Sequence, residues 1–211
     1  RISWGTVSKV DGPHIDVATE PLILQNGSFT NTGGVIEALN ASQVQLTGAT
    51  IVGGTLSTTG TGVIRNTGGA TLQDVTLAST FAQNNNTTTT LVGTFTNQGT
   101  YQLNSGGNFT DLQISGDVLL TGMGTMTLSN LTTNRLLGNV NTNRLTNAQG
   151  HTIQGSGQIG VNQMRLTNAG LIEATQSTTL TIDPTDGANG VINTSTGRLR
   201  ANGGTLILQN G

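Results

Sequence analysis

The chain has 211 residues, of which 33% are apolar, 3% aromatic and 9% charged, and its formal net charge is −2. With one lysine and scattered arginines it lacks the clustered cations that hold a nucleic-acid backbone, and it has no run of about 18 apolar residues, so we expect neither nucleic-acid binding nor a membrane span. The sequence contains no cysteine, which excludes disulfides and thiolate metal sites.

Residues 1–20 fit no later pattern and are interpreted as an entry segment or the end of a preceding region. From Pro21 to Gly211, short runs of alternating apolar and polar residues, such as Val44-Gln45-Leu46, are each ended by Gly or Asn pairs. Alternation of period two predicts strands, and the Gly and Asn pairs predict tight turns. No window of a dozen residues has the apolar spacing of a helix. The last residues echo residues 22–27, so we expect a fragment of, or a unit within, a longer assembly.

One short pattern recurs along the chain: an apolar residue, usually Thr, then Asn, followed by Gly and a new alternating run. Its copies are Phe29-Thr30-Asn31, Phe95-Thr96-Asn97, Leu145-Thr146-Asn147, Leu166-Thr167-Asn168 and Val191-Ile192-Asn193. A short unit repeated throughout a chain indicates stacked coils, in which neighbouring coils cover the few inward-facing side chains. We therefore predict an all-β, single-stranded parallel β-helix, a β-solenoid.

The coil length is estimated from equivalent apolar residues. Leu56 to Leu72 is 16 residues, Leu72 to Leu91 is 19 and Ile172 to Ile192 is 20. These intervals predict about ten coils of roughly 20 residues.

Two polar segments interrupt the pattern and are candidates for a specific surface, because solenoids carry function on inserted loops. The first contains Asn84, Asn85 and Asn86, and the second is rich in Asn and includes Arg135 and Arg144. Neither segment shows a known ligand motif.

Residues 183–190 contain the densest group of oxygen ligands. Asp183, Asp186 and Asn189 could hold Ca²⁺, which accepts flexible oxygen shells, although an ordinary Pro/Gly turn explains the same residues. We expect no other cofactor. Gly155–Gly160 has the glycine spacing of a dinucleotide-binding turn, but the next repeat follows where that turn needs a helix, so coil turns are the better interpretation.

The sequence shows no catalytic constellation. Glu37 and Glu173 occupy the same position in two copies of the repeat, which favours solvated strand positions over a converging acid pair. His14 and His151 have no nucleophile-elbow motif to serve and are expected on the surface. Threonine pairs such as Thr94/Thr96 and Thr125/Thr127 are 31 residues apart, too irregular for a hydroxyl row that recurs once per coil.

The segments Asn31–Ala38, Gly53–Ile64 and Asn168–Ala174 resemble repeats of very large secreted bacterial surface proteins, which include filamentous-haemagglutinin-like adhesins and autotransporter passengers. The resemblance covers residues 21–211. It implies a right-handed parallel β-helix, export to the bacterial surface or medium, and a role as adhesin, filament or matrix component. The Asn-Pro motifs of two-partner secretion domains are missing, since none of Pro13, Pro21 and Pro184 follows Asn.

Two functional hypotheses remain open. The first is a non-enzymatic extracellular solenoid that acts as a stalk, adhesive surface or filament subunit and binds itself end to end or a cell-surface ligand. The alternative is a carbohydrate-binding or carbohydrate-processing β-helix, such as a tailspike-like protein or a polysaccharide lyase, which would require acids and aromatic residues along one strand face.

Overall fold

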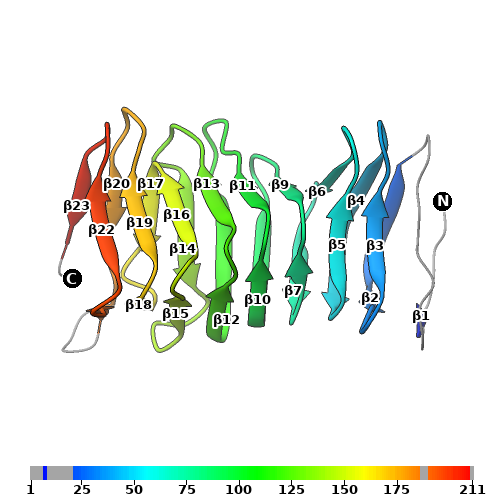
Figure 1. Ribbon diagram of the computed structural model, residues 1–211, viewed down its shortest axis with the longest axis horizontal. Coiled ribbons are helices and arrows are strands. Elements are labelled where there is room, and N and C mark those ends of the chain that lie inside the picture. The colour runs from blue at the N-terminus through cyan, green and yellow to red at the C-terminus, as the bar shows by residue number, and fades with distance from the viewer. Residues whose placement is uncertain (1–6, 9–20, 186–189, 210–211) are drawn as a thin grey trace.

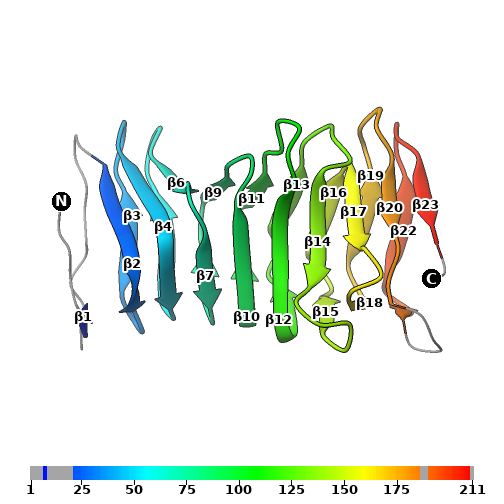
Figure 2. The ribbon, with the colours of Figure 1, turned by 180° about the vertical axis from the view of Figure 1, so that it is seen from behind.

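The computed structural model describes residues 7–8, 21–185 and 190–209, and these residues form a parallel β-solenoid (Figures 1 and 2). The chain advances along the long axis one coil at a time, and each strand pairs in parallel with its counterpart in the next coil, as β2 (Leu22–Thr30) does with β4 (Gln43–Val52). The described residues contain no helix. The predicted all-β solenoid is therefore confirmed.

Each coil contributes one strand to each of three faces, which we call A, B and C. Face A consists of the first halves of β2 and β4, then β6 (Val63–Asn66), β9 (Thr80–Gln83), β11 (Thr100–Leu103), β13 (Thr125–Leu128), β16 (Thr152–Gly155), β19 (Leu171–Ala174) and β22 (Arg198–Ala201). Face B consists of β1 (Val7–Ser8), the second halves of β2 and β4, β7 (Ala70–Gln73), the first halves of β10 (Thr88–Asn97) and β12 (Thr110–Thr121), β14 (Asn134–Gly138), β17 (Gly157–Gly160), β20 (Leu180–Ile182) and β23 (Leu206–Leu208). Face C consists of β3 (Val35–Ala38), β5 (Thr55–Thr58), β8 (Thr76–Leu77), the second halves of β10 and β12, β15 (Arg144–Asn147), β18 (Arg165–Asn168) and β21 (Val191–Asn193).

The four longest strands each cross a corner between two faces. A left-handed residue makes the bend: Asn26 (φ 51°) in β2, Gly48 (φ 62°) in β4, Gly93 (φ 71°) in β10 and Gly116 (φ 76°) in β12. Glycine and, more rarely, asparagine accept this conformation at low cost. The Gly and Asn punctuation of the sequence therefore marks corners of the coil.

The predicted count of about ten coils is wrong. On face A the inward column runs from Leu22 to Leu199 in eight register steps, and the steps vary from 17 residues (Ile64 to Phe81) to 27 (Met126 to Ile153). The later coils are longer because their corners carry extra loop residues.

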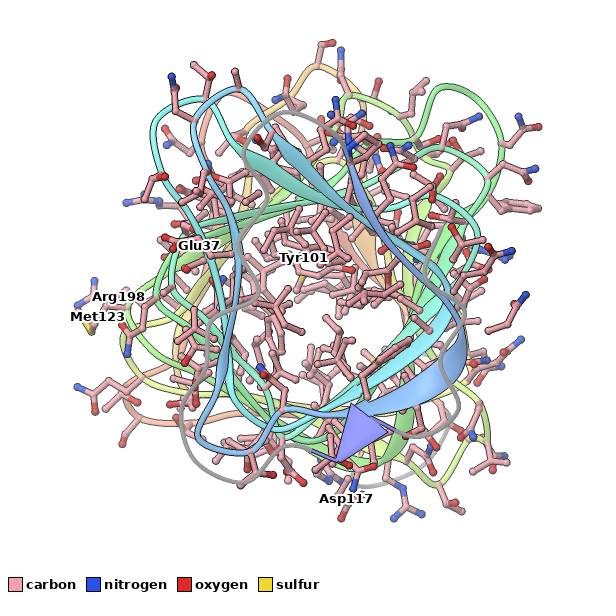
Figure 3. The ribbon with its side chains drawn as sticks, turned by 90° about the vertical axis from the view of Figure 1, so that its right-hand side faces the viewer. Glu37, Tyr101, Asp117, Met123 and Arg198 are labelled. Atoms are coloured by element: carbon pink, nitrogen blue, oxygen red, sulfur yellow. The ribbon has the colours of Figure 1, made fainter. Side chains whose placement is uncertain are left out.

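Inward-facing side chains of the three faces fill the solenoid (Figure 3). Tyr101 lies fully buried inside the cross-section, where its ring stacks on Phe81 at 5.0 Å between centroids and meets the edge of Phe95 at 5.9 Å. Its hydroxyl donates to buried Gln83 Oε1 at 2.7 Å, and burial raises the pKa of Tyr101 well above its ordinary range. Burial of each such side chain stabilises the fold by about 1.5–3 kcal/mol.

Threonines stack in register on the outer surface. Face A carries the row Thr80, Thr100, Thr125 and Thr152, and face C carries Thr55, Thr76, Thr96 and Thr121. The sequence interpretation that threonines recur too irregularly for one row per coil is wrong, because coil length varies while the strand register is kept. Identical stacked side chains pack well in parallel ladders.

Candidate binding surface

The corner between faces A and B carries loops that depart from the regular coil. Residues 84–87, 104–109 and 129–133 connect the two faces in three successive coils, and we call these loops together the A–B ridge. The predicted surface residues Asn84, Asn85 and Asn86 all lie in its first loop. Such corner insertions on a rigid scaffold are where a solenoid can present a specific surface.

The first loop of the ridge holds the second. Asn85 Oδ1 accepts hydrogen bonds from the backbone N–H of Gly106 (2.7 Å) and of Asn108 (3.1 Å), and the Asn86 N–H donates to Thr110 Oγ1 at 3.2 Å. Ser105 Oγ lies 2.8 Å from the Asn108 carbonyl oxygen, to which it donates. The backbone of residues 105–108 is therefore fixed from both sides.

Buried Asn134, the first residue of β14, joins the second loop of the ridge to the third. Its Oδ1 accepts from the Ser105 N–H at 3.1 Å, while its Nδ2 donates to the carbonyl oxygens of Ser129 (2.8 Å) and Leu131 (2.9 Å). In the third loop, Asn130 Oδ1 accepts from the Thr178 N–H two coils further on. Side-chain amides thus replace the regular strand ladder at this corner, where loop backbone would otherwise lack partners.

Beside the ridge, an arginine and an aspartate from neighbouring coils pair on face B. Arg135 Nε donates to Asp111 Oδ1 at 2.7 Å and Nη2 donates to Asp111 Oδ2 at 2.6 Å, and both side chains are 20% exposed. Bidentate pairs of this kind are the strongest and most directional ion pairs. The ring of Phe109, which ends the second loop and is 55% exposed, lies over the guanidinium with 3.7 Å between its centroid and Cζ. We call Phe109, Asp111 and Arg135 the face-B cluster.

Planar amides flank the face-B cluster. Gln158 lies next to Arg135 in the register of face B, and its Nε2 donates to the Thr132 carbonyl oxygen at 2.8 Å. Gln113 is two residues from Asp111 on the same strand, with its amide oxygen 3.5 Å from Thr90 Oγ1. Consecutive coils therefore place a carboxylate, a guanidinium and an amide in one row along the rod.

Of the residues that the sequence proposed for a surface, Arg144 lies elsewhere. It begins β15 on face C, where its N–H donates to Asp117 Oδ1 (3.1 Å) and its Nη1 donates to Thr167 Oγ1 (3.0 Å). Asp117 projects outward at the rim of the coil (Figure 3). The second predicted segment is thus divided between two faces, and only Arg135 joins the A–B ridge.

The calcium prediction stays a prediction. The Asp183 N–H donates to the Ile159 carbonyl oxygen and its own carbonyl accepts from the Asn162 N–H, both at 2.8 Å, but Asp186 and Asn189 lie outside the described residues. Within residues 21–185 and 190–209, no three His, Cys, Asp or Glu side chains are grouped as a metal site.

Gly155–Gly160 forms the end of β16, an A–B corner and β17. The corner is tight because a Cβ on Gly157 would lie 2.4 Å from the Asn134 carbonyl oxygen. The interpretation as coil turns is confirmed, since a strand follows these glycines.

The two glutamates do not occupy equivalent positions. Glu37 is on face C and Glu173 is on face A, because the copy that begins at Phe29 starts on face B whereas the copy that begins at Leu166 starts on face C. Glu173 is only 6% exposed and accepts from Arg200 Nε at 2.8 Å. The prediction of a solvated strand position is therefore wrong for Glu173.

The expectation of a surface His151 is also wrong, whereas His14 lies outside the described residues. His151 is fully buried at the corner between faces C and A, inside a row of asparagines. Its Nδ1 lies 2.8 Å from Asn147 Oδ1 and its Nε2 lies 3.0 Å from Asn97 Nδ2. Asn147 Nδ2 in turn donates to Asn168 Oδ1 at 2.8 Å, and Asn168 Nδ2 donates to Asn193 Oδ1 at 2.9 Å.

The directions of these bonds fix the imidazole as neutral. Asn147 uses its Nδ2 on Asn168, and Asn97 uses its Oδ1 on the Gly99 N–H, so His151 must donate from Nδ1 and accept at Nε2. Burial lowers the pKa of His151 to about 4. A buried neutral imidazole with both nitrogens bonded to asparagines is a structural element of the corner.

A groove of about 560 Å³ lies outside His151 on the same corner. It exists because three successive corners place Gly150, Gly170 and Gly197 at the surface, with Arg198 at one end. Arg198 and Met123 both project outward on this side of the rod (Figure 3).

The chain matches no protein-family model, no curated protein and no solved structure. Among the described residues no helix is long and apolar enough to cross a bilayer.

Proposed function

We propose that this chain is a non-enzymatic structural and adhesive β-solenoid that works outside the cell. The observation that carries the proposal is the A–B ridge, where an otherwise regular rod departs from its repeat and fixes three loops with buried and half-buried amides. A rigid loop surface on a stiff rod is suited to presenting contacts at a distance from an anchoring point.

The backbone supports the mechanical part of this role. On every face the strands of successive coils pair in parallel, as β11 does with β13 and β16 with β19, so hydrogen bonds run along the rod axis at the ~4.8 Å strand spacing. Stability of a solenoid comes from each coil and its contacts with its two neighbours. The rod can therefore carry an irregular corner without losing its core.

The family resemblance supports the adhesive and extracellular part. The repeats resemble those of large secreted bacterial surface proteins, and the solenoid that this resemblance implies is the fold of the described residues. Two of the acids that a carbohydrate-processing enzyme would use do not fit acid–base chemistry, because Asp111 is bound by Arg135 and Glu173 by Arg200.

Location is tested by labelling intact producing cells with an antibody to this chain. Labelling without permeabilisation is expected, and labelling only after permeabilisation would overturn the extracellular role. Electron microscopy over a range of protein concentrations then separates two forms of the proposal, since isolated rods indicate a stalk or adhesive arm and filaments indicate a polymer subunit.

Adhesion is tested with beads coated with the chain and exposed to cell layers and biofilm material. The matched control replaces residues 104–109 with a Gly/Ser segment of equal length and is checked for strand content by circular dichroism. We expect the control beads to attach much less. Equal attachment of both bead types would contradict adhesion through the A–B ridge.

A further inference from the structure

We propose that the face-B cluster, Phe109, Asp111 and Arg135 with Gln113 and Gln158 beside it, binds an extended neutral carbohydrate chain. This inference rests on the adhesive function proposed above and names the ligand of that surface. It follows from the exposed aromatic ring, the neutralised charge pair and the direction of the row.

The aromatic ring is the first part of the argument. Phe109 is 55% exposed although one face of its ring lies on Arg135, so the opposite face is open to solvent. Its loop is fixed by Asn85 and Ser105, so the ring is held in place before any ligand arrives. The C–H face of a pyranose stacks on such an apolar ring, and a preorganised ring loses little entropy on binding.

The charge pair indicates a neutral ligand. Because Arg135 and Asp111 bind each other through two hydrogen bonds, the cluster carries no net charge. An anionic sugar would have to compete with Asp111 for the guanidinium and would meet its repulsion. A sugar hydroxyl, which both donates and accepts, can bond the guanidinium N–H and the carboxylate lone pairs that the pair leaves unused.

The arrangement of the row indicates a chain rather than a single sugar. Asp111, Arg135 and Gln158 come from successive coils and are paired in register on face B, so they follow the rod axis at steps of about 4.8 Å. A ligand that lies along the rod meets a carboxylate, a guanidinium and an amide in turn, with Phe109 at one edge. Several weak contacts in line favour an oligosaccharide over a monosaccharide.

The test is isothermal titration calorimetry of the whole chain with four neutral hexasaccharides (cellohexaose, laminarihexaose, xylohexaose and mannohexaose), with glucose, and with an acidic galacturonate hexamer. We expect at least one neutral hexasaccharide to bind, and to bind more tightly than glucose and the acidic hexamer. Phe109→Ala should weaken that binding about tenfold or more, because truncation of a central aromatic contact removes a large share of binding energy.

Two further variants keep the result interpretable. Gln113→Ala removes a neighbouring amide and should weaken binding about threefold, a smaller loss than that of the aromatic ring. Met123→Ala removes a side chain that is 77% exposed at the opposite corner and should leave binding unchanged. Unaltered binding by Phe109→Ala, stronger binding of the acidic hexamer, or no binding of any neutral hexasaccharide would each overturn the inference. If coated beads still attach to cells in that case, the adhesive function stands and only its ligand is wrong.

Discussion

The A–B and C–A corners solve one problem in two ways, since both must satisfy polar groups where the chain leaves a strand. At the C–A corner the same residue type recurs in register, and Asn147, Asn168 and Asn193 bond head to tail. At the A–B ridge each amide has its own task, as Asn85 holds one loop and Asn134 joins two others. Repetition produces a regular corner, whereas individual contacts produce a surface unlike its neighbours. Four experiments can break or sharpen this contrast.

The largest effect is expected for Asn134→Ala at the ridge. Its buried amide serves the Ser105 N–H and the carbonyl oxygens of Ser129 and Leu131, so the variant leaves several buried groups without a partner. Each such group costs about 1–3 kcal/mol, which predicts a loss on the order of 4 kcal/mol in the free energy of unfolding, measured by urea denaturation. Asn104→Ala, at an exposed residue in the same ridge, should change it by less than about 0.5 kcal/mol. Similar losses in both variants would show that Asn134 does not organise the ridge.

At the C–A corner, acid should have a somewhat smaller effect. The pKa of His151 is about 4 in the folded chain and 6.5 in the unfolded chain, so between these values the unfolded chain binds more protons. The contribution to stability is full above about pH 6.5 and falls as the pH drops to about 4, by about 3 kcal/mol in total. Protonation would also turn Nε2 into a donor facing the Asn97 amide.

The measurement is the free energy of unfolding from pH 8 to pH 3.5 for the wild-type chain and for His151→Gln. Glutamine keeps an amide that can bond both asparagines but cannot be protonated in this range. The difference between the two curves should rise with pH between about 4 and 6.5 and be flat elsewhere. A constant difference would mean that His151 does not couple this corner to pH.

Within the row itself, Asn168→Ala should cost about 2 kcal/mol. Asn168 accepts from Asn147 and donates to Asn193 and the Arg198 carbonyl oxygen, but Asn193 is exposed, so water can replace part of what is lost. The readout is again urea denaturation, with exposed Asn141→Ala as the control. A loss as large as that of Asn134→Ala would contradict the view that a regular corner distributes its hydrogen bonds more evenly than the ridge.

These two corners also show what the sequence could and could not predict. The strands and corners follow from local signals, alternation and Gly or Asn, so the solenoid was predictable. The recurring Asn row was visible as a repeat, and four of its five copies, those that begin at Phe95, Leu145, Leu166 and Val191, do stack on face C. The copy that begins at Phe29 lies on face B, because a pattern of apolar residue, Thr and Asn ends a strand equally well at any corner.

The candidate site depends on coil length, which the sequence does not reveal. Asp111 and Arg135 are 24 residues apart and become neighbours only because the corner between them holds a loop of that size. The Asn-rich segment at 84–86 was a visible signal, but its role in fixing the loop of Phe109 requires the register of three coils. His151 was missed for the same reason, since its burial depends on a corner that is longer than the one after Asn168.

The smallest and most specific effect is expected for Asn85→Ala. Because Asn85 is half-buried and the loop it holds is exposed, the variant should lose only about 1 kcal/mol of folding free energy. Its effect on the surface should be larger, since the N–H groups of Gly106 and Asn108 lose their acceptor. Hydrogen exchange should show faster exchange of these two amides, with the C–A corner unchanged, and carbohydrate binding should weaken less than in Phe109→Ala. If the two amides stay protected, the second loop of the ridge is fixed by Ser105 and Asn134 alone, and Asn85 is not what holds the ring of Phe109 in place.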